Sequence, residues 1–425
     1  MAATPLKQDY WSYVKRQFSK NKRAVFSAWF VFILMLVAVF ADFIANEKPI
    51  AFKDKEGWHF PVFKEYGVKL GLTRWPAEWA NMRWSQMEFE AAVYAPVPYS
   101  PTTQDYNNAQ FASPFEEQDV RSARWRHWLG TESLGRDVLS AMVHGTRIAF
   151  MVGLVSMSIA TLIGVFLGAL AGYFGDDRLQ VSRISLYLGI LFAIPAYFYS
   201  FQARAHILSA AIADSFLAFL FQLIISLVIF AGFTGFVWLI GRPFQKSAFL
   251  GKKIGLPVDI IVQRIIEILV SIPKLFLIIA IVAIAKPSVM LVMAVIGLTS
   301  WTEIARLIRA ELLKVRNLEY VEAAHALGFP SWRILLRHAV PNAISPVLIA
   351  VAFGIASAIL VEGFLSFIGI GIPPEVLTWG KLLSLSRSAP WWFAIAPGFA
   401  IFLVVTLFNL LGEGLTDATD PRQKR

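Results

Sequence analysis

Residues that could carry out chemistry are scarce in this 425-residue chain. Its six histidines show no i,i+4 pairing with a carboxylate base, which argues against a zinc hydrolase. No phosphate-binding Gly-x-x-x-x-Gly-Lys-Ser/Thr segment occurs. Gly251-Lys252-Lys253 lacks the earlier glycine and the hydroxyl, and Gly369-Ile370-Gly371 runs into two prolines. We therefore expect no catalytic residue, no metal site and no bound cofactor in this chain.

The remaining candidates are ionisable residues within long apolar runs. Glu267 lies three residues after Arg264, Lys274 follows a proline, and Glu362 lies deep in its run. Such side chains are costly in lipid and should face protein, water or a partner. Because a proton relay needs several carboxylates and only Glu362 lies deep, we favour a hydrogen-bonding role for it over a transport role. Glu267 and Glu362 are kept as candidate intramembrane polar sites.

The composition indicates the elements that hold these residues. Hydrophobic residues make up 57% of the chain and charged residues 16%, against roughly a quarter charged in soluble domains. With a mean hydropathy of +0.58, this excludes an ordinary soluble enzyme and favours several membrane spans. The absence of cysteine excludes disulfides and thiolate catalysis. The net charge of +10 fits cytoplasmic loops of a membrane protein, so no nucleic-acid partner is expected.

The apolar runs predict an all-α membrane helical bundle with about eight spans. The segment 45–146 between the first two spans is polar and irregular and is expected outside the membrane as a loop or small domain. The span at 184–201 is short and contains Pro195, so a re-entrant segment is the alternative there. The expected spans are residues 24–44, 148–172, 184–201, 216–240, 262–284, 288–305, 346–367 and 391–412.

The basic residues predict the orientation. More than half of the 39 Lys and Arg residues lie before residue 24 or in loops on that same side. Since Lys and Arg are enriched in cytoplasmic loops, we expect residues 1–23 and the C-terminus to be cytoplasmic. A signal peptide cleaved near Val39-Phe40-Ala41 is the alternative for 24–44, although its basic lead-in is long.

The cytoplasmic segment 306–343 predicts two helical arms joined by a turn, which we call the elbow. Trp301–Leu327 is expected as one helix that ends at Gly328, where glycine supplies a left-handed turn. Ser331 can cap the next helix, which would run to Pro341. Its apolar face would contain Trp332, Leu335, Leu336 and Val340, with Arg333 and Arg337 opposite. The alternative is a loop lying on anionic lipid.

Small residues recur every four positions in the second span, at Gly164, Gly168 and Gly172. They place a smooth strip on one helical face, where another helix can approach closely. Packing within one subunit is favoured over a special dimer contact.

A family resemblance rests on the elbow. Glu322-Ala323-Ala324, Gly328 after three residues and Pro341 resemble the EAA motif of transmembrane subunits of ABC importers, E-A-A-x3-G-x9-I-x-L-P. The chain departs from this motif at His338 and Val340. Arg337-His338 and Pro341-Asn342 are instead similar to the dipeptide/oligopeptide/nickel permease branch. Similar stretches occur at residues 127–137, 171–175, 271–273, 362–369 and 408–418, in the order of that branch's C-type subunit.

The resemblance implies a type I ABC importer permease fold and a five-part bacterial inner-membrane importer of peptides or similar small solutes. The other parts would be a homologous second permease, two cytoplasmic ATPases that bind ATP and Mg²⁺, and an extracytoplasmic solute-binding protein. This subunit would be non-catalytic. The residues expected to couple it to the ATPases are Glu322, Ala323, Ala324, Gly328, Trp332, Arg333, Leu336, Arg337 and Pro341.

Two regions depart from the usual six-span subunit. The family normally has a short connection where this chain carries an insertion at about 180–256, expected as an apolar hairpin with Arg204, His206 and Asp214 in its outer loop. The outer region 45–146 is similar to the enlarged loop of microcin C and oligopeptide-type permeases. The permease core is thus expected at 147–425.

Two other classes of membrane protein fit this sequence less well. A secondary transporter should carry ionisable residues at mid-membrane in paired halves, and none are found. A membrane-tethered receptor or assembly factor would need only one or two spans. The sequence leaves the cargo and the role of the inserted hairpin open.

Overall fold

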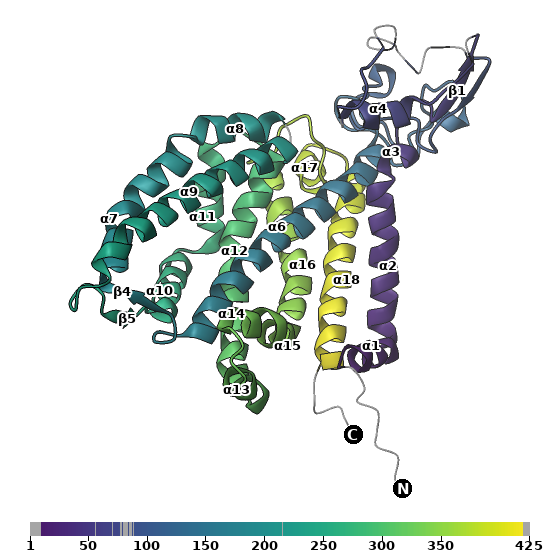
Figure 1. Ribbon diagram of the computed structural model, residues 1–425. Helices are drawn as coiled ribbons and strands as arrows, with labels where there is room; N and C mark the ends of the chain where they lie inside the picture. Colours follow the sequence, from purple (N-terminus) through teal and green to yellow (C-terminus); the bar gives the residue numbers. More distant parts are fainter. Residues whose placement is uncertain are drawn as a thin grey trace. The chain divides into compact units, whose positions relative to one another are not determined.

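The computed structural model describes residues 10–55, 57–69, 71–76, 79, 84, 87, 89–214 and 216–419. It is mostly helical, as expected (Figure 1). The chain forms two compact units. Unit 1 comprises Met1–Gly164, Leu269–Leu307 and Asn342–Arg425, and unit 2 comprises Val165–Ile268 and Ile308–Pro341.

Seven helices in the described residues are long and apolar enough to cross a membrane. The expected span 262–284 is wrong as a single helix. It consists of α10 (Val258–Ser271) and α11 (Lys274–Ile284), bent by 79°. Pro273 explains the break, because proline lacks an N–H and disfavours helix at the preceding residue. The doubtful span 184–201 belongs to a 29-residue helical stretch, Arg183–Ala211, which is long enough to cross.

Unit 1 contains most of the long helices. Helix α18 packs against α2 on one side and α16 on the other (Figure 1). The helices of this unit are α1 (Tyr10–Lys20), α2 (Lys22–Val39), α3 (Ala41–Ile44), α4 (Pro61–Lys69), the first part of α6 (Val138–Phe174), α11, the first part of α12 (Val289–Val315), α16 (Ser345–Ile368), α17 (Trp379–Leu385) and α18 (Ile395–Thr419).

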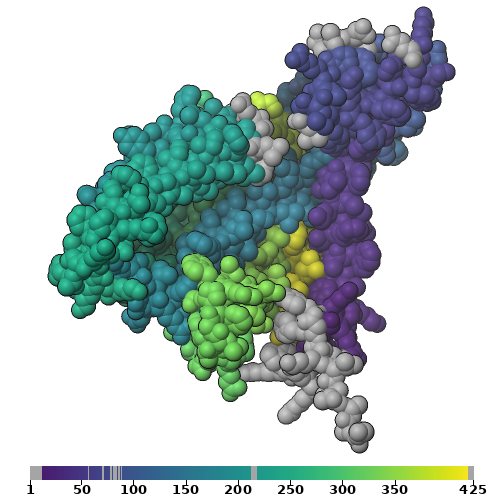
Figure 2. Space-filling view, viewed as in Figure 1, coloured from purple at the N-terminus to yellow at the C-terminus, as the bar shows by residue number. Residues whose placement is uncertain are grey.

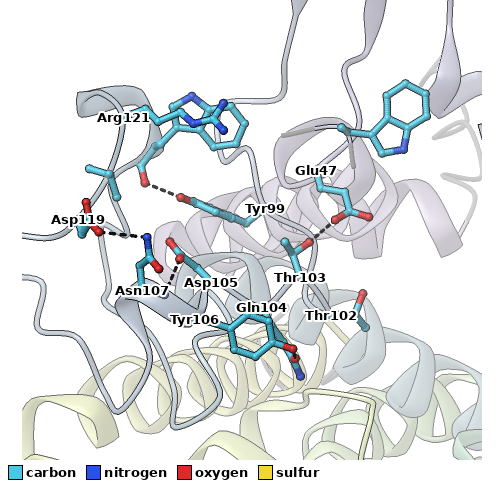
Figure 3. Close-up of a pocket in the computed structure, with 13 residues that line it drawn as sticks. Glu47, Tyr99, Thr102, Thr103, Gln104, Asp105, Tyr106, Asn107, Asp119 and Arg121 are labelled. Atoms are coloured by element: carbon cyan, nitrogen blue, oxygen red, sulfur yellow. Dashed lines mark hydrogen bonds between the residues drawn. The ribbon is translucent and has the colours of Figure 1, made fainter. Parts of the chain in front are cut away.

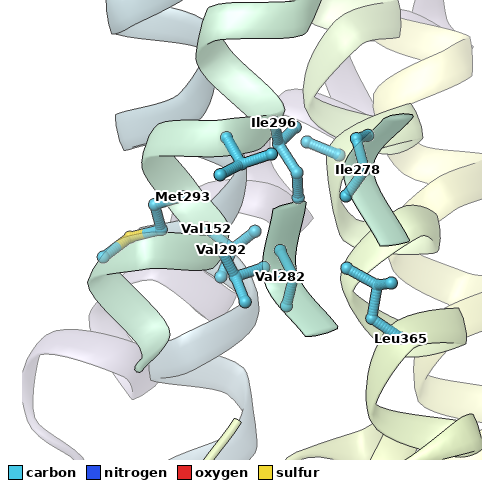
Figure 4. Close-up of a cluster of buried hydrophobic side chains, with 9 residues drawn as sticks. Val152, Ile278, Val282, Val292, Met293, Ile296 and Leu365 are labelled. Atoms are coloured by element: carbon cyan, nitrogen blue, oxygen red, sulfur yellow. The ribbon is translucent and has the colours of Figure 1, made fainter. Parts of the chain in front are cut away.

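An apolar core holds α6, α11, α12 and α16 together (Figure 4). Ile278 and Val282 of α11 are fully or almost fully buried against Val292 and Ile296 of α12, and Leu365 joins them from α16. Only aliphatic side chains and Met293 form this cluster, so shape and dispersion hold this part of α11 in place.

Arg147 ties the beginning of α6 to the end of α2. Its guanidinium donates to the carbonyl oxygens of Ala38 (2.8 Å) and Val39 (3.3 Å), which the helix itself leaves unpaired. It also pairs with the buried carboxylate of Asp42 at 2.8 Å. The cation therefore satisfies a helix C-terminus that water would otherwise have to solvate.

The outer region forms a small folded part of unit 1. Strands β1 (Ala51–Asp54), β2 (Gly57–His59) and β3 (Ala91–Val93) make an antiparallel sheet in the order β2-β1-β3. Its core is aromatic, with Phe52 packed at 5.6–5.8 Å from Trp79 and Trp84. Because the chain has no cysteine, this region is stabilised by packing of aromatic rings and not by disulfides.

Unit 2 contains the inserted hairpin and the elbow. The hairpin consists of α7 (Arg183–Tyr197), a π-helical turn (Phe198–Gln202), α8 (Ala205–Asp214) and α9 (Phe216–Phe244). A two-stranded ribbon of β4 (Gln180–Ser182) and β5 (Lys253–Gly255) closes it. The expected outer loop is largely helical, because His206 and Asp214 lie in α8 and only Arg204 lies in the turn before it. From this turn Arg204 donates to Gln222 Oε1 (2.6 Å) and Ser226 Oγ (3.1 Å) of α9.

The glycine strip of α6 packs on α12 within the chain, as favoured. A Cβ on Gly164 would lie 2.8 Å from Ile304 Cβ and from the Trp301 carbonyl oxygen. In unit 2, a Cβ on Gly172 would lie 2.7 Å from the Arg309 carbonyl oxygen. Both distances are too short for a side chain, so only glycine permits this approach.

We expect Gly164→Ala to lower the thermal stability of the purified chain, because overpacking costs about 1–3 kcal/mol. Gly235→Ala in α9 is the matched control, since no atom lies within 4 Å of the added Cβ and alanine favours helix by about 1 kcal/mol. Its melting temperature should be unchanged or higher. Equal melting temperatures for Gly164→Ala and the parent chain would contradict the close packing.

Candidate functional site

The first arm of the elbow differs from the expected single helix. Helix α12 ends at Val315, and α13 (Glu319–Ala326) follows after a turn. At this turn Asn317 donates its side-chain amide to the Leu313 carbonyl oxygen at 3.3 Å. Such a bond competes with continued helix, which gives a local reason for the break.

Gly328 has the positive φ that the sequence predicts. Its φ is 78°, and a Cβ there would meet no atom within 4 Å, so conformation and not space requires glycine. The Phe329 N–H donates to the Ala324 carbonyl oxygen (3.2 Å) and the Gly328 N–H to that of His325 (2.9 Å). These bonds close the end of α13.

The second arm has a different register from the expected helix. Pro330, and not Ser331, occupies the N-cap position, and no side chain caps α14 (Ser331–Ile334). A π-helical turn (Leu335–Ala339) and α15 (Val340–Ala343) follow. Leu335 is buried, whereas Leu336 is 65% exposed, so the expected apolar face is wrong.

The exposed side of the elbow mixes apolar and basic side chains. Leu327 is 76% exposed and Trp332 47% exposed, beside Arg333, whose guanidinium lies 5.0 Å from the Phe329 ring. The elbow is light green in Figure 2. We call the following exposed residues of the elbow, together with the half-buried Ala324, the elbow surface: Glu322, Ala323, Leu327, Phe329, Trp332, Arg333, Leu336, Arg337 and Pro341.

The C-terminal end of α6 holds the elbow within unit 2. The Tyr173 hydroxyl and His325 Nε2 are 3.0 Å apart, and the two rings stack. Phe174 packs on Trp332 at 5.0 Å, and Arg316 donates to the Gly172 carbonyl oxygen at 3.4 Å. Sequence reasoning missed Tyr173, although its place in Ala171-Gly172-Tyr173-Phe174-Gly175 marked the segment.

A second link in unit 2 joins α10 to α12. The guanidinium of Arg309 donates to both carboxylate oxygens of Asp259, at 2.5 and 2.6 Å. Such two-pronged pairing fixes orientation as well as distance. It was also missed, because nothing in either local pattern pairs residues 50 positions apart.

The two candidate intramembrane carboxylates differ in environment. Glu267 is exposed and forms an ion pair with Arg264 at 2.6 Å. This pair lies on the surface and is not part of a buried site. Glu362 is 2% exposed and accepts from the hydroxyl of Ser366 at 2.7 Å. It also bonds Thr378, which caps α17. These contacts correspond to the hydrogen-bonding role favoured for Glu362.

The outer region contains a buried histidine clamp and an open cavity. His127 is fully buried, with Nδ1 2.8 Å from Asp137 Oδ2 and Nε2 3.2 Å from Asp105 Oδ2. Asp137 Oδ1 accepts from the Ser140 N–H and so caps α6, while Tyr99 stacks on the imidazole at 4.2 Å. The clamp therefore joins the outer loops to the beginning of α6.

Asp105 also lines the cavity, which has a volume of about 680 Å³ (Figure 3). Its wall carries two further carboxylates, Glu47 and Asp119, and one guanidinium, Arg121. Glu47 accepts from Thr103 and Asp119 from Asn107. Among the described residues, no group of three His, Cys, Asp or Glu side chains could hold a metal ion.

Two models of known protein families match parts of this chain. The family model for the inner membrane component of binding-protein-dependent transport systems matches residues 247–425. The model for the N-terminal TM domain of oligopeptide transport permease C matches residues 9–56. The glutathione transport system permease protein GsiD of Pectobacterium atrosepticum is 30% identical over 302 residues, covering 70% of this chain and 73% of that protein. The chain belongs to the family of binding-protein-dependent transport permeases.

Two further relatives of this permease align along nearly its whole length. The inner membrane ABC transporter permease protein YejE of Escherichia coli is 26% identical, covering 99% of this chain and 98% of its own. The peptidoglycan transport system permease protein YejE of Agrobacterium fabrum is 27% identical, covering 96% and 92%. The expected family is thus confirmed: the permease is a multi-pass inner-membrane subunit of an ATP-driven importer, a family that works with ATPases and substrate-binding proteins.

The histidine clamp makes the permease's stability depend on pH. Burial lowers the pKa of His127, but hydrogen bonds to Asp105 and Asp137 outweigh burial and raise it. Burial raises the pKa of Asp105, but hydrogen bonds from His127 and Asn108 outweigh that effect and lower it. The stabilisation from His127 is complete below its unfolded pKa of about 6.5 and is lost as pH rises through the raised value. That from Asp105 is present above about 3.9 and is lost as pH falls through the lowered value.

We therefore expect His127→Gln to destabilise the permease most between about pH 4 and 6.5, by about 2–3 kcal/mol for the lost charged hydrogen bonds. The difference in melting temperature from the parent chain should shrink toward pH 9. Groups that do not contact His127 titrate equally in both chains, so their contributions cancel. Asp105 loses its His127 partner in the variant, so its altered titration is part of the measured difference. A difference that stays constant or grows toward pH 9 would contradict a protonated His127.

The Tyr173–His325 contact should restrain α13. Tyr173→Phe removes only the hydroxyl, and losing a hydrogen bond of about 1 kcal/mol should raise amide exchange in 319–326 by roughly fivefold. Hydrogen-exchange mass spectrometry measures this directly. Tyr197→Phe is the control, since Tyr197 is exposed in the hairpin. Unchanged exchange in Tyr173→Phe would show that the hydroxyl does not hold the elbow.

Proposed function

We propose that this permease forms half of a translocation path for peptides and couples it to two cytoplasmic ATPases through the elbow surface. The other half would be a homologous second permease, and an extracytoplasmic solute-binding protein would deliver cargo. ATP and Mg²⁺ would bind to the ATPases, and this chain would catalyse no reaction. Its N- and C-termini would be cytoplasmic.

The observation that carries the coupling role is the exposed elbow surface. The large apolar side chains of Leu327, Trp332 and Leu336 are exposed, and Trp332 and Leu336 directly precede Arg333 and Arg337 in the sequence. An exposed apolar patch with basic neighbours is typical of a docking surface. Because Tyr173 and Arg316 hold the elbow to α6, a partner that moves the elbow would move α6 as well.

The cargo class is supported by the relatives. The names of two of them concern glutathione and peptidoglycan. The peptidoglycan transport permease aligns over 96% of this chain, and the glutathione permease over 70%. We therefore propose short peptides as cargo, with peptides released from peptidoglycan as the first to test.

Two substitutions test the coupling role. Gly328→Val forces a β-branched residue into a positive φ, and Ala324→Asp places a charge beside the elbow surface. In proteoliposomes containing the whole complex, both should reduce peptide uptake and peptide-stimulated ATP hydrolysis together by tenfold or more, about 1.4 kcal/mol or more of coupling energy. Peptide binding to the separate binding protein should stay unchanged.

Gly189→Val in α7 is the matched control, because Gly189 has open space and lies within a helix. It should retain uptake and stimulated hydrolysis. Normal uptake and hydrolysis in both elbow variants would rule out the elbow as the coupling site. Purification of the tagged chain without any ATPase would rule out the proposed assembly.

A further inference from the structure

One end of the inserted hairpin gathers basic side chains. Helix α7 begins at Arg183 and α9 ends at Phe244, so the two antiparallel helices bring these ends together. A Cβ on Gly241 would lie 3.6 Å from Leu188 and 3.7 Å from Ser185 Oγ, which places the end of α9 against the first turn of α7. The basic residues in or next to this end are Arg178, Arg183, Arg242, Lys246, Lys252 and Lys253.

The β4–β5 ribbon brings the last of these residues to the same end. The Arg183 N–H donates to the Lys252 carbonyl oxygen (3.1 Å), and the Ile184 N–H donates to that of Leu250 (3.1 Å). The nearest carboxylates in sequence are Asp176 and Asp177, and Asp176 already accepts from the Ile260 N–H. Among the described residues, no carboxylate pairs with Arg183 or Arg242.

Three of these cations lie over aromatic rings: Arg178 lies 5.9 Å from the Tyr173 ring, and Arg183 and Arg242 lie closer to theirs. The guanidinium carbon of Arg242 lies 3.7 Å from the centre of the Trp238 ring, and that of Arg183 lies 4.8 Å from the Phe249 ring. Stacking uses the face of a guanidinium and leaves the N–H groups at its edge free to donate. Trp238 is 51% exposed and Phe249 63% exposed, as is typical of aromatic side chains at a membrane–water interface.

The hairpin sides next to this end are apolar and uncovered. Their exposure suits hydrocarbon, and the helical stretches Arg183–Ala211 and Ala218–Phe244 are both long enough to cross a membrane. The basic end therefore lies where a lipid headgroup would meet the helices. The exposed residues include Ile190, Leu191, Ile194, Phe221, Ile224, Val228, Phe236 and Leu239.

We propose that this end of the hairpin binds the phosphodiester headgroup of anionic phospholipid, with Arg183 and Arg242 as the principal donors. Guanidinium edges match phosphate oxygens in two-pronged bonds, and the neighbouring lysines add attraction to an anionic surface. The acyl chains would lie along the apolar sides of α7 and α9. The inserted hairpin is then a lipid anchor of the permease, a role independent of its cargo and of the elbow.

The test uses the full purified chain in nanodiscs of equal phosphatidylglycerol and phosphatidylcholine. After extraction into detergent, native mass spectrometry counts the retained lipids, and melting temperature is measured with each lipid added back. The parent chain should retain phosphatidylglycerol several-fold over phosphatidylcholine, and only phosphatidylglycerol should raise its melting temperature. The double variant Arg183→Gln/Arg242→Gln should lose most of both effects.

Two further variants keep the result interpretable. Arg183→Lys/Arg242→Lys keeps both charges but loses the planar edges, so it should retain an intermediate amount of phosphatidylglycerol. Lys20→Gln/Lys286→Gln removes two exposed cations elsewhere and should behave as the parent chain. Even if the glutamine variant folds poorly, the lysine variant still distinguishes two-pronged hydrogen bonding to the phosphate from simple charge attraction to an anionic membrane.

Three outcomes would overturn the proposal. The first is equal phosphatidylglycerol retention in the parent chain and the glutamine variant. The second is an equal rise in melting temperature with inorganic phosphate alone, which would indicate a free-anion site. The third is unchanged lipid retention with loss of a co-purifying subunit from the glutamine variant, which would make this end a protein-binding surface.

Discussion

The close approach of α6 to α12 is the constraint on which the described helices depend. Three glycines mark it: Gly297 of α12 against Ser156 and Ile159, Gly164 against Trp301 and Ile304, and Gly172 against Arg309 and Leu312. Hydrocarbon gives helices no hydrophobic drive to associate, so contact surface and close packing must supply it. The same α6 carries the outer clamp at its first turn and Tyr173 at its last.

Polar contacts hold each end of α6 in place. In between, Gly164 holds it in place by allowing close contact with α12. At the outer end, Asp137 caps the helix and binds His127, and at the other end Tyr173 and the Gly172 carbonyl oxygen engage the elbow. Polar bonds at helix ends can be exchanged with water or partners, whereas glycine contacts in the middle cannot.

Local patterns in the sequence were enough to predict seven of the eight spans, the glycine strip and the positive φ of Gly328. Each of these depends on a run of apolar residues, on helical periodicity or on one residue's conformational range. Local patterns failed where one additional residue in a helical turn changes which side chains face the core. The π-helical turn at Leu335–Ala339 buries Leu335 and exposes Leu336, and no spacing rule indicates the extra residue. His127, Arg309 and Arg147 were missed as site residues because their partners lie 10 to 109 positions away.

The bond from Arg147 to the end of α2 also bears on how the chain enters the membrane. The carbonyl oxygen of Ala38 accepts from Arg147, which is synthesised 109 residues later. At about 5–20 residues per second, that interval is about 5–20 seconds. During it the end of α2 must be solvated by water, lipid headgroups or the insertion machinery. The end of the first span, α2, thus gains its final hydrogen bonds only after the second span, α6, has been synthesised and inserted.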